Sequence, residues 1–218
     1  MLIPLDYLVQ KYNVKFNGIL HVGAHECEEL TAYEKYIGRN KILWVEGLED
    51  KVAWAKQHIT DVHIEHAVVS DKIETVVFNR SNNGQSSSIL ELGIHREHHP
   101  HVWYVESVNV ETKMLRDFIG NYDISYNFLN LDIQGAELKA LKGMEEYLSK
   151  VDYIYSEVNS DYVYKGCALV GELDEYLEAF GLVRVETDWT PYKWGDAFYV
   201  RKQLLPPVVQ HKIGRIWS

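Results

Sequence analysis

Cysteine is scarce in this 218-residue chain, which contains only Cys27 and Cys167. The two lie far apart in the sequence, and neither belongs to a Cys-x-x-Cys pair. A disulfide framework needs a denser set of cysteines, and a thiolate zinc site needs closely spaced pairs. The sequence therefore indicates neither, and its composition fits a reduced, cytoplasmic setting.

Positive charge and long apolar runs are also lacking. The chain has 22 Lys and Arg against 32 Asp and Glu, a formal net charge of -10. Nucleic acids and anionic membranes bind through clustered basic residues, so neither is expected as the main partner. No apolar run approaches the roughly 20 residues that span a bilayer. Asp6 interrupts the first residues too early for a signal peptide. We therefore expect a cytoplasmic protein without a membrane span.

The composition is that of one globular domain. Apolar residues make up 46% and charged residues 25%, and no low-complexity tract or internal repeat divides the chain. We expect a single domain over residues 1–202, beginning with a leading helix within 1–17. Pro206 and Pro207 exclude a regular helix across the tail 203–218. The tail is expected to pack on the domain or on a neighbouring subunit, and the latter would give a homo-oligomer.

Short apolar runs alternate with amphipathic segments, which is typical of an α/β fold with a mostly parallel sheet and helices on both faces. Expected strands lie at 18–22, 41–45, 62–69, 75–78, 106–110, 127–131, 151–158, 182–186 and 197–201. Expected helices cover 4–12, the acidic stretch from Glu26, 50–58, a segment capped by Thr112, 136–149 and 169–180. The last two strands follow each other without a helix, which indicates an antiparallel hairpin at the sheet edge.

Residues 79–101 break this alternation. The segment is rich in Asn, Ser and Gly and then carries His95, His98, His99 and His101. Long excursions inside a compact domain are more often functional than not, so we expect a substrate-facing loop or lid. The histidines lack a helical pair with an accompanying general base, and no cysteine lies nearby, so no metal site is predicted.

The stretch 127–138 is the most informative part of the sequence. An apolar run ends abruptly at Asp132, and Gly135 then leads into Ala136-Glu137-Leu138 at the head of a helical pattern. This predicts a buried strand, a tight turn and a helix. Ligands bind beyond the carboxyl ends of strands in a parallel sheet, so Asp132 is a candidate site residue.

Two other expected strand ends carry residues of the same kind. The first strand is followed by Gly23-Ala24-His25, and the second ends on Glu46, about twenty residues further on. In Rossmann-like units an acid at that position accepts hydrogen bonds from ribose hydroxyls. Together with Asp132, these positions outline a nucleoside-binding crevice.

The first turn argues against a dinucleotide. It lacks the Gly-x-Gly-x-x-Gly pattern and is followed by Glu26, Glu28 and Glu29. A pyrophosphate prefers a helix N-terminus without competing anions, whereas a cationic, phosphate-free nucleoside tolerates them. The pattern therefore favours a sulfonium cofactor over NAD.

These residues resemble the FkbM-type S-adenosylmethionine-dependent methyltransferases. The resemblance rests, in family order, on Leu20-His21-Val22-Gly23-Ala24-His25, Trp44-Val45-Glu46, Ala67-Val68-Val69-Ser70-Asp71, Gln85-Ser86-Ser87-Ser88, Asp132-Ile133-Gln134-Gly135-Ala136-Glu137 and Ser156-Glu157-Val158. It implies a Rossmann-like class I methyltransferase fold with a mostly parallel seven-stranded sheet, and S-adenosyl-L-methionine as the cofactor. It also implies methyl transfer to a hydroxyl oxygen, often of a saccharide, as in polysaccharide biosynthesis.

The same resemblance implies roles for individual residues. The turn 23–25 would wrap the methionine part of the cofactor, Glu46 would hold the ribose, and the segment 67–68 would flank the adenine. Asp132 would lie beside the amino-acid end or the methyl group. The residues expected to bind the cofactor are His21, Gly23, Ala24, His25, Glu46, Ala67, Val68 and Asp132. His21, His25 and Cys27 stand where many family members have Asp, Asn and Gly.

Catalysis in such a site needs alignment more than a strong base, because an alcohol loses its proton only during attack. Asp132 and Glu157 are the candidate bases, ahead of a histidine from the 95–101 loop. The residues expected to contact the acceptor are Ser86, Ser87, His95, Gln134 and Trp189. Gln134 could instead brace its turn, and Trp189 could instead pack the hairpin.

The function best supported by the sequence is therefore O-methyl transfer to a hydroxyl, most often of a saccharide. Two alternatives stay open. One is a catalytically silent module of the same fold that binds a glycan or a protein partner. The other is a nicotinamide-dependent oxidoreductase, which the missing glycine pattern speaks against.

Overall fold

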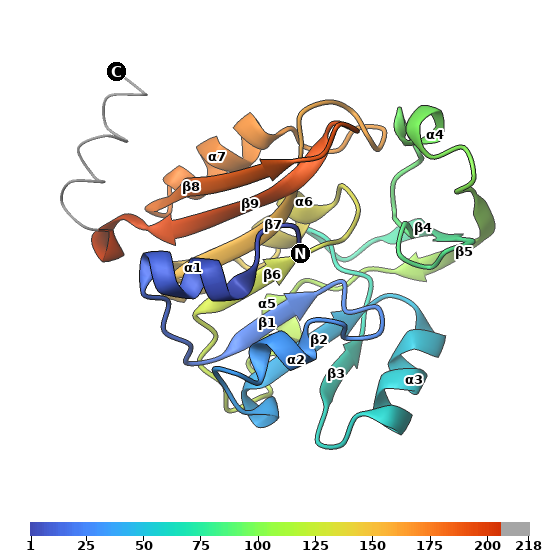
Figure 1. The fold of residues 1–218 in the computed structure, drawn as a ribbon. Coiled ribbons are helices and arrows are strands. Elements are labelled where there is room, and N and C mark those ends of the chain that lie inside the picture. Colours follow the sequence, from blue (N-terminus) through green and yellow to red (C-terminus); the bar gives the residue numbers. More distant parts are fainter. Residues whose placement is uncertain (206–218) are drawn as a thin grey trace.

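The computed structural model describes residues 1–205, which are built around one large sheet (Figure 1). Its seven strands lie in the order β3-β2-β1-β6-β7-β9-β8. Five of them run parallel: β1 (Ile19–Val22), β2 (Ile42–Glu46), β3 (His63–His66), β6 (Phe128–Leu131) and β7 (Tyr153–Asn159). The prediction of a mostly parallel seven-stranded sheet is confirmed.

The last two strands form the predicted hairpin. β8 (Leu182–Trp189) and β9 (Trp194–Arg201) pair antiparallel, and β9 also pairs antiparallel with β7. β9 therefore lies inside the sheet, and β8 forms its edge. Both strands extend further toward the hairpin tip than the apolar runs alone indicated.

Helices cover both faces of the sheet, as predicted (Figure 1). Successive residues of a strand point to opposite faces, so in β1 Ile19 and Leu20 belong to different cores. One face packs against α1 (Leu5–Tyr12), α2 (Leu30–Tyr33) and α3 (Glu49–His58). The other packs against α5 (Arg116–Ile119), α6 (Glu137–Lys142), η2 (Glu145–Lys150) and α7 (Val170–Glu178). Two further short helices are η1 (Arg39–Lys41) and η3 (Lys202–Leu204).

The segment that breaks the alternation stands to one side of the sheet (Figure 1). β4 (Thr75–Ser81) and β5 (Tyr104–Glu111) pair as a separate antiparallel ribbon, and α4 (His95–His98) lies between them in the chain. Residues 79–101 therefore contain the end of β4 and one short helix as well as irregular backbone.

The acidic stretch from Glu26 does not begin a helix, contrary to the sequence prediction. It forms turns, and α2 starts only at Leu30. His25 and Cys27 have φ of 42° and 57°, in the left-handed region. Helical backbone needs negative φ, so these two residues delay the helix.

Two other elements differ from expectation near residue 112. Thr112 does not cap a helix: its hydroxyl donates to the Lys72 carbonyl at 2.7 Å and accepts from the Glu74 N–H at 3.0 Å. The strand expected at 62–69 ends at His66, and Val69 makes only an isolated bridge to Lys113. The chain leaves the sheet after His66, and residues 68–70 instead bond to Lys113, which follows β5.

The predicted C-terminal tail, 203–218, lies outside the described residues from position 206 onward. None of the helices in the described part of the chain combines the length and apolar character needed to cross a bilayer.

Candidate functional site

A cavity of about 420 Å³ opens at the carboxyl ends of β1, β2, β6 and β7. Residues that follow these strands line one side, and parts of the segment 83–102 line the other. This is the edge at which open parallel sheets bind ligands, and the volume is typical of small-molecule pockets. Three sequence-predicted positions, Gly23, Glu46 and Asp132, meet in this one cavity.

The first turn brings the ends of β1 and β6 close together. Gly23 has φ of 91°, and a Cβ atom there would lie 1.8 Å from the Asp132 carbonyl oxygen. Only glycine fits this approach. The N–H groups of Gly23 and Ala24 both donate to the Val45 carbonyl, at 2.9 and 3.1 Å, which fixes the turn against β2.

Glu46 is held by backbone donors. Its Oε2 accepts from the His25 N–H at 2.7 Å, and its Oε1 accepts from the Leu48 N–H at 2.7 Å. The side chain is buried, and this burial raises its pKa despite the two donors. A carboxylate can accept up to four hydrogen bonds, so Glu46, which lines the cavity, retains acceptor capacity for a ligand.

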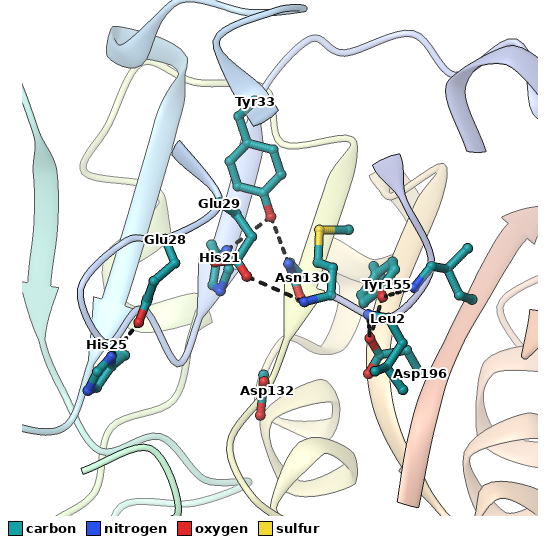
Figure 2. A network of polar contacts seen from close by, with 12 residues as sticks. Leu2, His21, His25, Glu28, Glu29, Tyr33, Asn130, Asp132, Tyr155 and Asp196 are labelled. Carbon is teal, nitrogen blue, oxygen red and sulfur yellow. Dashed lines mark hydrogen bonds and ion pairs between the residues drawn. The ribbon is translucent and has the colours of Figure 1, made fainter. Parts of the chain in front are cut away.

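His21 belongs to a buried chain of polar groups (Figure 2). Asn130 donates from Nδ2 to the Tyr33 hydroxyl oxygen at 2.7 Å, and that hydroxyl lies 3.0 Å from His21 Nδ1. Because Tyr33 accepts from Asn130, its own proton points to Nδ1, which places the His21 proton on Nε2. Burial lowers the pKa of His21, so the ring is neutral and offers a single N–H donor.

His25 lines the cavity beside this chain. Its Nδ1 lies 2.6 Å from Glu28 Oε1, while its Nε2 is buried without a hydrogen-bond partner in the described structure (Figure 2). A buried ring nitrogen without a partner is costly, and a bound ligand would satisfy it.

The residues after β6 and β7 form a second polar cluster. The Gln134 amide donates to Asp132 Oδ1 at 2.6 Å and to Glu157 Oε2 at 3.0 Å. Its carbonyl oxygen accepts from the Tyr164 hydroxyl. Gln134 adopts φ of 57°, a conformation that its side-chain contacts hold in place. Both amide hydrogens are therefore used within the protein.

Crowding of carboxyl groups shapes the proton affinities of this cluster. Burial, followed by the neighbouring Asp132, raises the pKa of Glu157 well above its usual range. Asp132 lines the cavity and its side chain is exposed to it; desolvation by the surrounding protein together with the charge of Asp196 raises its pKa to about 6. Asp196 is itself tied to the Leu2 N–H at 2.5 Å and to the Tyr155 hydroxyl (Figure 2). The crowding therefore favours protonation of one member of this cluster.

Glu137 braces the turn instead of entering the cavity. Its Oε1 accepts from the N–H groups of Ile133 and Gly135, both at 3.0 Å. The side chain is buried, and burial raises its pKa to about 7.

An apolar slot lies beyond Glu46. Ala67 and Val68 line it, as does Phe78, whose ring packs on Gly47. The Ala67 N–H donates to the Glu46 carbonyl at 2.9 Å, which links the slot to the end of β2. The sequence predicted Ala67 and Val68 as residues of the cofactor site, whereas Phe78 was not predicted to line it.

The segment 83–102 supplies the opposite wall. Ser86 and Ser87 line the cavity, and Asn83 fixes Ser86 through bonds of 3.0 and 3.1 Å. His95 also lines it, with an exposed fraction of 7%, and its Nδ1 has no partner in the described structure. Its ring lies 5.5 Å from that of Tyr164.

Trp189 lies outside the cavity. It is 40% exposed near the tip of the hairpin, and Trp194 lines the cavity in its place. Tyr164 was not predicted from the sequence, because it reaches the cavity only through tertiary packing.

The histidines at 95–101 pack with aromatic rings. His99 lies 4.9 Å from His95 and 4.7 Å from Tyr192, measured between ring centroids. Among residues 1–205, no three His, Cys, Asp or Glu side chains are grouped so as to hold a metal ion.

A parallel sheet of this order, with a glycine turn, an acid after the second strand and a carboxylate after the central strand, defines a Rossmann-like methyltransferase. The family follows from the sequence match: residues 21–183 fit the model of the Methyltransferase FkbM domain. This covers more than half of the chain, which therefore belongs to the FkbM methyltransferase family. FkbM methyltransferases use S-adenosylmethionine, which is the cofactor of this chain.

The chain also shows distant sequence similarity to a curated protein. A curated relative, the 2-O-methyltransferase NoeI of Sinorhizobium fredii (strain NBRC 101917 / NGR234), is 28% identical over 123 residues, which are 53% of this chain and 51% of NoeI. The match thus spans about half the length of that relative.

Solved structures share the fold. The ribosomal protein L11 methylase of Lactobacillus delbrueckii subsp. bulgaricus is 7% identical with a TM-score of 0.52, over 91% of this chain and 76% of that one. EvdMO1 is 13% identical with a TM-score of 0.50, over 90% of this chain and 39% of that one.

Proposed function

We propose that this methyltransferase transfers the methyl group of S-adenosylmethionine to a hydroxyl oxygen of a saccharide. The observation that carries the proposal is the cavity itself, in which an acid positioned for a ribose and a carboxylate with a pKa of about 6 face the same space. The name of the relative NoeI, a 2-O-methyltransferase, supports oxygen as the methylated atom.

The residues around the first turn fit the cofactor. Glu46 lines the cavity and its carboxylate retains acceptor capacity, which suits the two vicinal hydroxyls of a ribose. The slot formed by Ala67, Val68 and Phe78 suits an adenine ring. His21 and His25 line the cavity near Gly23 and would contact the methionine part of the cofactor. The cofactor would then also provide a hydrogen-bond partner for His25 Nε2, which has none in the described structure.

When bound, the cofactor supplies an electrophilic methyl group on a sulfonium centre. Asp132 would accept the hydroxyl proton as the new oxygen–carbon bond forms, and a base of this pKa is sufficient because the proton leaves during attack. Glu157, which was also predicted as a base, is proposed here to position Asp132 through the shared Gln134 amide.

The acceptor would lie between this cluster and the segment 83–102. Ser86, Ser87 and His95 offer polar atoms there, as the sequence proposed. Gln134 acts through Asp132 instead of binding the acceptor, because its amide is already engaged. Trp194 takes the place proposed for Trp189.

Calorimetric titration with S-adenosylhomocysteine, with NAD as the control, tests the cofactor site. We expect micromolar binding of S-adenosylhomocysteine and none of NAD. Radiolabelled methyl transfer from S-adenosylmethionine to a panel of sugars then tests the reaction. Binding without turnover of any hydroxyl acceptor would favour the silent glycan- or protein-binding module, and transfer to a nitrogen acceptor would contradict O-methylation.

A further inference from the structure

The cavity carries more acidic groups than cationic ones; the N-terminal ammonium of Met1 lines it and lies 3.6 Å from Glu29 Oε1. Five of its lining side chains are carboxylic acids, namely Glu28, Glu29, Glu46, Asp132 and Glu157. No Lys or Arg is among the lining residues of the described part of the chain. A site that binds a phosphate or a carboxylate ordinarily supplies Arg, Lys or free backbone N–H groups.

Basic side chains near the rim are committed elsewhere. Lys51 Nζ lies 2.5 Å from Glu26 Oε1. Arg80 makes two hydrogen bonds to Asp50, at 2.8 and 2.6 Å. Lys51 and Arg80 are therefore each paired with an acid that is not among the cavity-lining residues.

His95 and His99 of the opposite wall do not supply a positive charge. Burial, reinforced by the neighbouring histidines, lowers the pKa of His95 to about 4, and burial also lowers that of His99. Both rings are neutral at neutral pH. His95 presents Nδ1 as a neutral hydrogen-bonding atom that no protein group satisfies.

The remainder of this wall is aromatic. Tyr164 and Trp194 line the cavity beside His95, and aromatic faces pack well on the apolar faces of sugar rings. One unsatisfied neutral polar atom within an aromatic wall fits a hydroxyl-bearing, uncharged ring.

We infer that the acceptor is a saccharide unit without phosphate or carboxylate groups, so that methylation follows the glycosyl transfer that removes the nucleotide diphosphate. The inference rests on the proposed function and narrows its substrate class. The reaction that supplies the acceptor is then a glycosyltransferase step, and a nucleotide sugar is not the substrate.

Like charges juxtaposed in a site of this kind lower affinity strongly. A nucleotide sugar would place two phosphate charges near Asp132 and the glutamates, where the N-terminal ammonium of Met1 is already paired with Glu29. We expect kcat/KM to be at least about 100-fold lower for a nucleotide sugar than for the neutral glycoside of the same sugar.

The first test needs no knowledge of the true acceptor. Protein saturated with S-adenosylhomocysteine is titrated with UDP-glucose by calorimetry, for the wild type, His101→Lys and His58→Lys. His101 is an exposed residue of the cavity wall, and His58 is an exposed residue of α3 outside it. We expect no measurable binding of UDP-glucose to the wild type or to His58→Lys. For His101→Lys we expect an affinity at least tenfold above the detection limit of the titration.

Paired acceptors complete the test. Initial rates of methyl transfer are compared for methyl glucoside and UDP-glucose. Submillimolar binding of UDP-glucose to the wild type, no gain in His101→Lys, or faster methylation of a nucleotide sugar would each overturn the inference. Failure to bind S-adenosylhomocysteine would instead refute the proposed function.

Discussion

Replacement of Glu46 by glutamine separates cofactor binding from folding. The carboxylate accepts one backbone N–H on each oxygen and lines the cavity, where we propose that it also binds the ribose. Glutamine retains one oxygen and presents an NH₂ group in place of the other. A hydrogen bond to a charged group contributes about 1.5–3 kcal/mol, so the dissociation constant of S-adenosylhomocysteine should rise about 10- to 150-fold.

The same change should hardly affect stability. Glutamine loses one hydrogen bond to the turn, a cost of about 1 kcal/mol. It also removes a carboxylate whose burial raises its pKa, and this offsets part of the loss. The melting temperature should therefore fall by no more than about 2–4 °C. Glu46→Ala is a poorer test, because it leaves the N–H groups of His25 and Leu48 without acceptors.

Calorimetry and thermal unfolding of the same preparation measure both quantities. Glu49→Gln is the matched control, since Glu49 is an exposed glutamate three residues further along. Unchanged affinity in Glu46→Gln would refute the ribose assignment. Weaker binding accompanied by a large fall in melting temperature would show that Glu46 acts by holding the turn.

Three further predictions concern the cluster after β6. Asp132→Asn should lower kcat about 10²- to 10⁴-fold while S-adenosylhomocysteine still binds; a variant that keeps its rate would exclude Asp132 as the base. In the wild type, kcat should fall as pH drops through about 6, because Asp132 then becomes protonated, and a pH-independent rate between 5 and 8 would contradict this. Glu137 has a pKa of about 7 against an ordinary 4.5, so its contribution to stability is present below pH 4.5 and is lost as pH rises to 7, by about 3 kcal/mol. Glu137→Gln, which keeps the acceptor for Ile133 and Gly135, should then unfold at higher urea concentration than the wild type at pH 8, whereas Glu137→Ala should unfold at lower concentration.

Local sequence patterns determined most of the fold. The alternation of apolar runs and amphipathic segments predicted the parallel sheet, and the two closing runs predicted its hairpin. The strand, turn and helix around Asp132 were also readable, because a strand end, a glycine and a helix start lie within a few residues. The position of Glu46 followed from its spacing to the first turn in the same way.

Some secondary-structure predictions were wrong, because backbone conformation or contacts between distant residues determined the structure at those positions. The helix expected from Glu26 was wrong because His25 and Cys27 adopt positive φ, which composition does not reveal. Thr112 was expected to cap a helix and instead bonds to residues about forty positions earlier. The ribbon of β4 and β5 was read as two strands, but only pairing partners place it outside the main sheet.

The sequence by itself determined which residue types stand at the strand ends, and therefore the class of cofactor. Tertiary structure alone decided what those residues can do. Gln134 is engaged by Glu157 and Tyr164, 23 and 30 residues away, so its side-chain amide is occupied within the protein. The register of the hairpin, with its bulge between Arg184 and Glu186, places Trp194 in the cavity and leaves Trp189 outside. The charge of the cavity depends on burial and pairing of groups from several elements, and these quantities exist only once the chain is folded.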